Sequence, residues 1–455
     1  MKGIKVMKFG GTSVATHEAR HASAMRVISA REQGYRPVVV VSAMGRRGDP
    51  YATDTLIQLL TTIDPDTRPE LREQDLIMAC GEILSAVTFA HLLKTLGQPA
   101  KAFLGGQAGI RTDGVPGNAR ILSINPANLI ASLDQGKIPV VCGFQGTARD
   151  NEIPGGEITT LGRGGSDTTG AALGAALHAV AVEIFTDVDG IKTADPDSVK
   201  NAATLRKVSY NEVAEIAHLG AKVVHPRAAE IAMNNDIPLW VKNTMSDDVG
   251  TEIVRSDVLT DSRPTGVTHT GKLVYMQFDL SEASESHRTL LEGRLYEMLA
   301  RYNISLFMLN LSPTSTGFAV PRGQYPVVQD LLDGLVVPMQ RPAEPAANDV
   351  AVYFFQIGDA SKEVETQAKL LEVLGKVGRV RADLTEACSM VSLVGHEFMR
   401  QPGLFFKVLK TLADAQIPVL QTSDSDFSLS VLVPESDTNR AVRLIHDRFD
   451  LANSH

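Results

Sequence analysis

The sequence has few of the features that mark secreted or membrane proteins. Its 455 residues include only three cysteines, an odd number spread far apart, so a disulfide framework is not expected. No uninterrupted apolar run reaches the roughly 18–20 residues that cross a bilayer, and the N-terminal residues lack the apolar core of a signal peptide. We therefore expect a cytoplasmic protein with no membrane partner.

Positive charge is also scarce. The 44 Lys and Arg residues against 53 Asp and Glu give a net charge of −9, and there is no basic run. Such a chain binds polyanions poorly, so nucleic acid is not expected as a partner, although a small anion could occupy a local basic pocket. The pattern GxxxxGK[ST] is absent, which excludes the common P-loop nucleotide site.

What is present is apolar material for several cores, since 44% of the residues are hydrophobic and the length suits about three domains. Up to about residue 255, short β-rich runs alternate with helix-length stretches, which predicts a mostly parallel sheet covered by helices. The expected strands are Ile4–Phe9, Pro37–Ser42, Lys137–Cys142, Val182–Thr186 and Pro238–Lys242, and the expected helices are His17–Gln33, Glu73–Leu96, Ser166–His178 and Pro226–Asn234.

Beyond residue 255 the pattern predicts two smaller α+β units of βαββα type. A Pro- and Ala-rich segment, Pro338–Asn348, separates them and is typical of a linker. We expect domains at 1–260, 264–340 and 349–455. The sequence leaves open which strand belongs to which of the two smaller units.

Two glycine-rich turns stand before helices in the first domain. Lys8–Ser13 (KFGGTS) ends a predicted strand, where glycines and a helix N-terminus suit a phosphate, but a tight turn capped by Thr12 or Ser13 explains the same residues. In Gly162–Asp167 (GRGGSD), Arg163 can bind a carboxylate with two hydrogen bonds, while Ser166 or Asp167 could be a simple N-cap. Two such turns in one domain favour anion binding.

Further polar turns follow other strands. Thr186–Gly190 (TDVDG) and Gly220–Pro226 (GAKVVHP) are ordinary turn sequences, and they also place carboxylates and Lys222 where open α/β sheets bind ligands. His17 and His21 match the HExxH zinc pattern, but no third-ligand motif follows, so we expect no protein-held metal site.

Six motifs together resemble the aspartate kinase family and occur in that family's order. The C-terminal pair of units resembles its tandem ACT domains, which are ferredoxin-like. The motifs are KFGGTSV (Lys8–Val14), VVVVSAMG (Val38–Gly45), CGE (Cys80–Glu82), GRGGSDTTGAALGAAL (Gly162–Leu177), FTDVDG (Phe185–Gly190) and GAKVVHP (Gly220–Pro226). The resemblance implies an amino-acid-kinase fold and transfer of the γ-phosphoryl group of Mg-ATP to the β-carboxylate of L-aspartate, the first step of the lysine, threonine and methionine pathway.

The resemblance also assigns residues. Lys8 and Asp167 are expected to be catalytic, with Asp167 organising Lys8. Lys192 stands where many members have tyrosine. The implied ATP-binding residues are Lys8, Phe9, Gly10, Gly11, Ser42, Thr186, Asp187, Lys192, Asp195, Asp197 and Lys222, and the implied aspartate-binding residues are Thr53, Glu82, Arg163, Gly164 and Ser166.

Two other functions remain open at this stage. Within the same fold, an acetylglutamate kinase or glutamate 5-kinase is the nearer rival, but Glu82 favours a substrate with a free amino group. From a different class, the chain could be an amino-acid sensor with a non-catalytic kinase domain. Lys8, Glu82, Arg163, Asp167 and Asp187 are all present, which argues against that reading.

Regulation is expected in the last unit. Gln421, Thr422 and Asp424 lie in a polar segment that could bind an amino-acid effector or could be a simple turn. The ACT resemblance favours the effector site and implies a homo-oligomer formed through the ACT domains.

Overall fold

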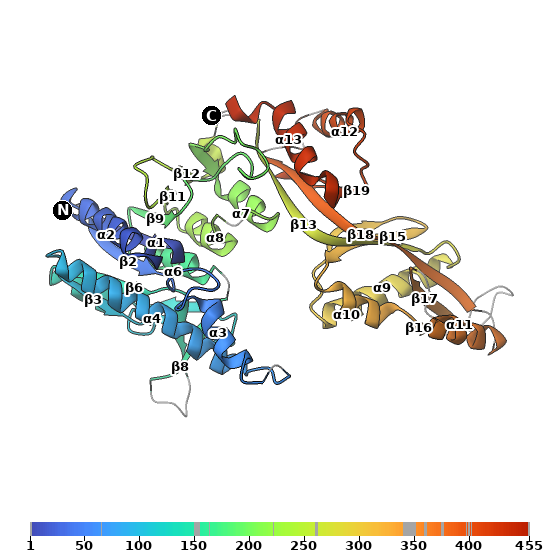
Figure 1. The fold of residues 1–455 in the computed structure, drawn as a ribbon, viewed down its shortest axis with the longest axis horizontal. Helices are drawn as coiled ribbons and strands as arrows, with labels where there is room; N and C mark the ends of the chain where they lie inside the picture. The colour runs from blue at the N-terminus through green and yellow to red at the C-terminus, as the bar shows by residue number, and fades with distance from the viewer. Residues whose placement is uncertain are drawn as a thin grey trace. The chain divides into compact units, whose positions relative to one another are not determined.

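A computed structural model describes all residues except 1, 65, 150–154, 163, 222, 260–262, 340–351, 359–361, 375–376, 397, 399–400, 402 and 454–455. Contacts divide the chain into two units (Figure 1). The first unit consists mainly of the residues up to Gly266, and the second mainly of Val267–Leu393 and Glu397–Phe449.

The first unit is built around an eight-stranded sheet in which parallel pairing runs from β11 to β3 and β12 pairs antiparallel with β11. Valine-rich strands such as β2 are buried on both faces, as a sheet covered by helices requires. The strand order is β10 (Lys207–Ser209), β12 (Thr251–Val254), β11 (Leu239–Asn243), β9 (Ala181–Thr186), β1 (Ile4–Phe9), β2 (Arg36–Val41), β6 (Ile138–Cys142) and β3 (Ala100–Phe103). All five strands expected from the sequence are present, and the mostly parallel α/β fold is confirmed.

Helices cover both faces of this sheet. One core cluster joins β1 and β2 to α1 (Gly11–Ala15), α2 (His17–Glu32) and α4 (Leu71–Thr95). A second cluster joins the opposite face to α5 (Ala127–Asp134), α6 (Gly165–Ala176), α7 (Tyr210–His218) and α8 (Pro226–Asn234). The four helices expected from the sequence match α2, α4, α6 and α8 to within two residues at each end.

A second, four-stranded sheet lies in the same unit. Its order is β5 (Ile121–Ile124), β4 (Ile110–Thr112), β7 (Gln145–Ala148) and β8 (Glu157–Thr160). Helix α4 contacts β8 as well as β2, β3 and β6. By length and composition α4 is the one helix in the described part of the chain that could cross a membrane, but half of its apolar window is buried within the unit.

The second unit contains one continuous sheet in the order β14-β15-β13-β18-β17-β16, and β20 pairs with both β18 and β19. Two long strands run through it, β13 (Pro264–Asp279) and β18 (Val377–Gly395). The other elements are α9 (Glu285–Arg301), β14 (Phe307–Leu311), β15 (Ser315–Pro321), α10 (Tyr325–Leu332), β16 (Val336–Pro338), β17 (Val352–Ile357), α11 (Lys362–Leu374), α12 (Leu404–Asp414), β19 (Gln421–Asp424), β20 (Ser428–Pro434) and α13 (Thr438–Arg448).

The boundary expected between residues 340 and 349 lies between two strands that pair with each other. β16 and β17, which flank it, pair antiparallel, with Val336 opposite Phe354. One core cluster holds Phe278 and Phe318 together with Phe355. The elements on the two sides of that boundary therefore share a sheet and a core. The Pro- and Ala-rich segment itself lies largely outside the described residues.

Candidate active site

The carboxyl ends of β1, β2 and β9 meet at one edge of the large sheet. β1 is the middle strand, with Lys8 opposite Val40 on one side and Ile184 on the other. Side chains alternate along β1, so Met7 and Phe9 enter the core beneath α2 and α4, while Lys8 lies on the α6 face. A lysine thus reaches the sheet edge, where open α/β sheets bind ligands.

The turn after β1 is packed tightly against its neighbours. The Gly10 N–H donates to the Phe185 carbonyl at 3.0 Å, so the sheet already uses that donor. A Cβ atom on Gly11 would stand 2.6 Å from the Gly45 carbonyl oxygen and 2.9 Å from that of Ala43. Gly11 is therefore required for the close approach of the loop after β2, whatever its role toward a phosphate.

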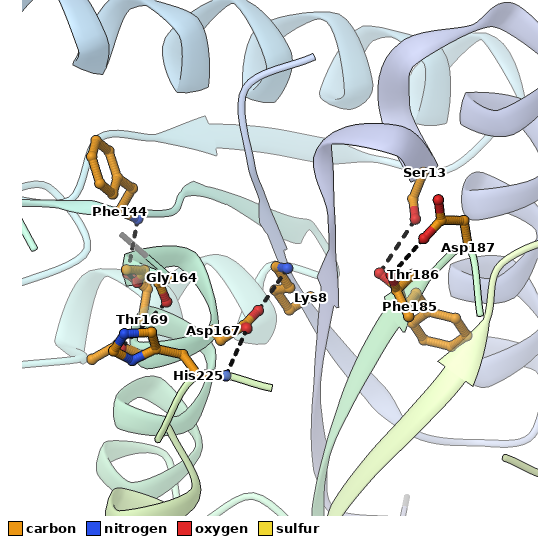
Figure 2. A network of polar contacts seen from close by, with 12 residues as sticks. Lys8, Ser13, Phe144, Gly164, Asp167, Thr169, Phe185, Thr186, Asp187 and His225 are labelled. Carbon is orange, nitrogen blue, oxygen red and sulfur yellow. Dashed lines mark hydrogen bonds and ion pairs between the residues drawn. The ribbon is translucent and has the colours of Figure 1, made fainter. Parts of the chain in front are cut away.

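Lys8 forms a buried ion pair with Asp167. Its Nζ lies 2.6 Å from Oδ1 of Asp167, and the two residues are 8% and 9% exposed. Asp167 stands in the first turn of α6, and its Oδ2 accepts the backbone N–H of His225 at 3.3 Å (Figure 2). The ammonium is thereby fixed at the end of β1.

α6 can approach the sheet because it is made of small residues. A Cβ atom on Gly170 would lie 3.4 Å from Lys8 Cβ, and one on Gly174 would lie 2.4 Å from Val182 Cγ2. The helix begins after Gly164, which has a left-handed conformation at φ 72°. Close packing of the helix on β1 and β9 places Asp167 within reach of Lys8.

A cavity of about 970 Å³ opens beside this ion pair. It collects candidate residues from five separate segments of the sequence, which no local pattern brings together. The predicted site residues that line it are Lys8, Ser42, Thr53, Glu82, Gly164, Ser166 and Asp167.

Glu82 is the most unusual group in the cavity wall. It is 2% exposed, its Oε1 accepts the Ala43 N–H at 3.0 Å, and its Oε2 has no hydrogen-bond partner. Burial raises the pKa of Glu82 to about 8, against the opposing effect of the Ala43 hydrogen bond. An unpartnered buried carboxylate oxygen at a cavity wall is well suited to a cationic ligand group.

The polar residues expected around a nucleotide are partly engaged with one another. Thr186 Oγ1 donates to Asp187 Oδ1 at 3.1 Å, and Asp187 pairs with Arg46 from the loop after β2 (Figure 2 shows Thr186 and Asp187). Lys192 Nζ donates to Thr204 Oγ1 at 3.1 Å. Asp195 accepts the backbone N–H of Asp197 at 2.9 Å, and both are exposed.

Some predicted residues lie elsewhere. The Phe9 ring is in the core, stacked on Phe185 with centroids 4.8 Å apart, so only its backbone borders the site edge. Arg163 and Lys222 lie outside the described residues. The His17 and His21 rings are 6.4 Å apart on α2, and the described residues contain no group of three His, Cys, Asp or Glu that could hold a metal ion.

The effector candidates Gln421, Thr422 and Asp424 lie on a strand and not in a simple turn, one of the two alternatives that the sequence left open. Gln421–Asp424 forms β19, which pairs antiparallel with β20, and Thr422 lies opposite Val431. Pairing with β20 overrides the turn preference of these short polar residues. Because alternate side chains of a strand share a face, Thr422 and Asp424 lie together and Gln421 lies on the other face.

Two neighbours of the site were not singled out from the sequence. His225 packs on the turn before α6, since a Cβ atom on Gly164 would lie 2.2 Å from its ring. His225 is part of the GAKVVHP motif, so a signal existed. Arg46 meets Asp187 across 141 positions of sequence, and no local pattern indicates such a partner.

Comparisons with known proteins identify the families that the chain matches. Residues 3–243 match the amino acid kinase family, and residues 383–447 match the ACT domain. Aspartokinase 1 of Bacillus subtilis is 37% identical over 456 residues, covering 99% of both chains. E. coli aspartokinase III, in a crystal structure with aspartate and ADP (R-state), is 25% identical with a TM-score of 0.69, covering 98% of this chain and 99% of that one. Its crystal structure with lysine and aspartate (T-state), at 24% identity, TM-score 0.67 and the same coverage, shows the shared fold.

The raised pKa of Glu82 predicts a pH-dependent cost in stability. The folded chain keeps the proton up to a pKa of about 8, while an unfolded glutamate releases it near 4.5, so stability falls as the pH rises through this interval. Glu82→Gln keeps an acceptor for Ala43 and removes the charge. We expect it to raise Tm at pH 8 by at least about 2 °C, with the gain shrinking toward pH 5.

Thermal unfolding across this pH range checks the expectation. Glu73→Gln is the matched control, because Glu73 is a half-exposed carboxylate on the same helix that pairs with Arg72. An equal gain for both variants, or a gain that does not depend on pH, would contradict the assignment.

Proposed function

The chain belongs to the aspartokinases of the amino acid kinase family and is an ATP-dependent kinase, and we propose that it phosphorylates the β-carboxylate of L-aspartate in the cavity beside Lys8 and Asp167. The observation that carries the residue assignment is the buried carboxylate of Glu82, with an unpartnered oxygen, in the same cavity as the Lys8 ammonium. The product is 4-phospho-L-aspartate, with ADP released.

The reaction needs positioning and charge neutralisation more than proton transfer. The aspartate side chain has an unperturbed pKa of about 3.9, so it is already a nucleophilic carboxylate at neutral pH. Attack on the γ-phosphorus then requires alignment and stabilisation of the charge on the transferred group. Lys8 supplies a positive charge at the sheet edge, and Asp167 holds its ammonium in place.

Recognition of aspartate is assigned to three residues of the cavity wall and to Arg163. The Oε2 atom of Glu82 accepts the α-ammonium group, and Thr53 and Ser166 supply hydroxyl groups from the cavity wall. Arg163 is proposed for the α-carboxylate because a guanidinium binds a carboxylate with two hydrogen bonds. An acetylated amino group would lose the ion pair with Glu82, which disfavours acetylglutamate.

ATP is proposed to occupy the edge formed by the ends of β1, β2 and β9. Its phosphates would lie near Lys8, Gly10, Gly11 and Ser42, and its remaining contacts are assigned to a second group. That group is Thr186, Asp187, Lys192, Asp195, Asp197 and Lys222.

Mg²⁺ completes this proposal. Mg²⁺ is usually bound by one or two carboxylates together with substrate phosphates, so it is proposed to enter with ATP. Asp187, a partly exposed carboxylate at the end of β9, is the residue proposed to contact it. When bound, the ion neutralises phosphate charge.

The ADP-release assay tests the function. Purified protein with Mg-ATP should release ADP with L-aspartate, and much less with L-glutamate or N-acetyl-L-glutamate. A folded protein that binds amino acids but releases no ADP, with or without aspartate, would support the non-catalytic sensor instead.

The second unit is proposed to regulate the enzyme through an amino-acid effector such as lysine, threonine or diaminopimelate. The shared core and paired strands support a revised division, with the first ACT module ending within β18 and the second formed by the rest of β18, α12, β19, β20 and α13. The ACT match at residues 383–447 agrees with this division. We further propose homo-oligomerisation through this unit, and a cytoplasmic location.

Lys8→Met is expected to lower kcat by about 10²–10³, the loss typical of one preorganised transition-state donor. The KM values for aspartate and ATP should change less. Lys5→Met is the matched control, because Lys5 lies on the same strand and is also ion-paired, to Glu183 at 3.1 Å. Near-normal turnover of a folded Lys8→Met protein would remove Lys8 from the mechanism.

The KM for aspartate is expected to depend on pH through Glu82. Binding of the ammonium group requires the carboxylate, and the carboxyl group has a pKa of about 8 in the free enzyme. KM should therefore rise about tenfold for each pH unit below 8, while the KM for ATP stays level. Glu82→Gln should flatten this profile. An equal dependence of the KM values for aspartate and ATP on pH would contradict the assignment.

Thr422→Val combined with Asp424→Ala is expected to weaken inhibition by the effector at least about fivefold, since these side chains share one face of β19. IC50 values for lysine, threonine and diaminopimelate measure the effect. Gln421→Ala, on the opposite face, is the comparison variant. If none of these amino acids inhibits the wild type at millimolar concentration, the regulatory proposal fails.

A further inference from the structure

A fully buried carboxylate with partners for both oxygens lies outside the predicted site. Asp75, in the first turns of α4, is 0% exposed. Both of its oxygens lie 3.0 Å from the backbone N–H of Gly117, Oδ2 accepts the Thr160 N–H at 2.9 Å, and Oδ1 accepts the Thr160 hydroxyl at 2.5 Å. A carboxylate held by three donors is a strong tie between the segments that supply them.

These segments each form part of the cavity wall. α4 contributes Met78 and Glu82, the loop before β5 contributes Gly117, and the turn that follows Thr160 contributes Gly162 and Gly164. Asp75 and Glu82 are seven residues apart, about two helical turns, and both are buried. The same face of α4 therefore carries Asp75, which holds these segments together, and Glu82, the proposed ammonium site.

The segments also contact one another around this point. The Ala119 N–H donates to the Thr160 carbonyl at 2.8 Å. A Cβ atom on Gly162 would lie 3.1 Å from Asn118 Oδ1 and 3.3 Å from the Gly117 carbonyl oxygen. Displacing Thr160 from Asp75 would thus move the loop and the glycine turn together.

The chemistry requires a carboxylate and not an amide. The two backbone groups that face Asp75 are donors, and the Thr160 hydroxyl donates to Oδ1. Because the Gly117 nitrogen lies 3.0 Å from both oxygens, the side-chain NH₂ group of Asp75→Asn would stand against that N–H in either orientation, and one of its own N–H groups would be buried without an acceptor. The substitution keeps the size and changes only this complementarity.

We propose that Asp75 is a positioning residue for the amino-acid half of the site, because it fixes the separation between Glu82 and the two cavity-wall glycines Gly162 and Gly164. That separation sets the width of the cavity where the α-ammonium group of aspartate is proposed to bind. The inference rests on the proposed function and adds a residue that touches neither substrate.

Steady-state kinetics with each substrate tests the inference. Asp75→Asn should raise the KM for aspartate roughly 10- to 100-fold, the scale expected from misplacement of a binding group by about 1 Å, while the KM for ATP changes by less than about twofold. Thr160→Val, which removes one donor and keeps the backbone tie, should give an intermediate rise. Thr160→Ser, which keeps the hydroxyl, should restore the wild-type KM.

Thr159→Val is the matched control. Thr159 is the neighbouring residue on β8, and its hydroxyl pairs with Thr112 Oγ1 at 2.6 Å, in contact with another strand. Thr159→Val should lower Tm without changing the KM for aspartate. If Asp75→Asn does not fold, Thr160→Val and Thr160→Ser decide the question.

The outcomes separate the two levels of the proposal. An unchanged aspartate KM in Asp75→Asn and Thr160→Val, with only a lower Tm, would overturn the positioning role while leaving the kinase function standing. An equal rise of KM for both substrates, or an equal rise in Thr159→Val, would also overturn it. A wild type that releases no ADP with aspartate would overturn the proposed function itself, and the positioning role with it.

Discussion

The ion pair between Lys8 and Asp167 joins the end of the central strand to the start of a helix, and the geometry of the site depends on it. Two charges taken out of water are stable only when each satisfies the other, so neither residue can move alone. The pair forms because α6 lies close to the sheet, where Gly174 leaves no side chain in the way of Val182 on β9. The small residues of GRGGSDTTGAALGAAL are thus a packing requirement as much as a ligand signature.

Two carboxylates on α4 differ in what surrounds them. Asp75 has donors for both oxygens, whereas Glu82 has one donor and one unpartnered oxygen. Since buried polar atoms are normally paired, Asp75 follows the rule and Glu82 departs from it, which is why Glu82 is the residue proposed to bind a cationic ligand group. Burial raises the pKa of Glu82 to about 8, so its charged form is costly in the free protein.

Much of the first unit could be predicted because its signals are local. Continuous valine runs such as Val38–Val41 predict strands covered on both faces, and the glycine turns mark the strand ends. Asp75 could not be found in this way, because its partners lie 42 and 85 positions along the chain and an aspartate early in a helix is ordinary. The sequence left open whether the polar segment with Gln421, Thr422 and Asp424 is an effector site or a simple turn, and its pairing with β20, which makes it a strand, is not visible in the local pattern.

The segment that the sequence predicts as a linker lies between two strands of one sheet. β16, which ends at Pro338, and β17, which begins at Val352, are hydrogen-bonded neighbours. A linker-like composition therefore does not exclude pairing between the elements on its two sides. β18 then continues from its pairing with β17, through residues Val377–Ala382, toward its pairing with β20. One strand thus connects the pairing of β19 and β20 to the sheet whose core cluster holds Phe318 and Phe355, and this is the physical connection through which the proposed effector site would act on that core.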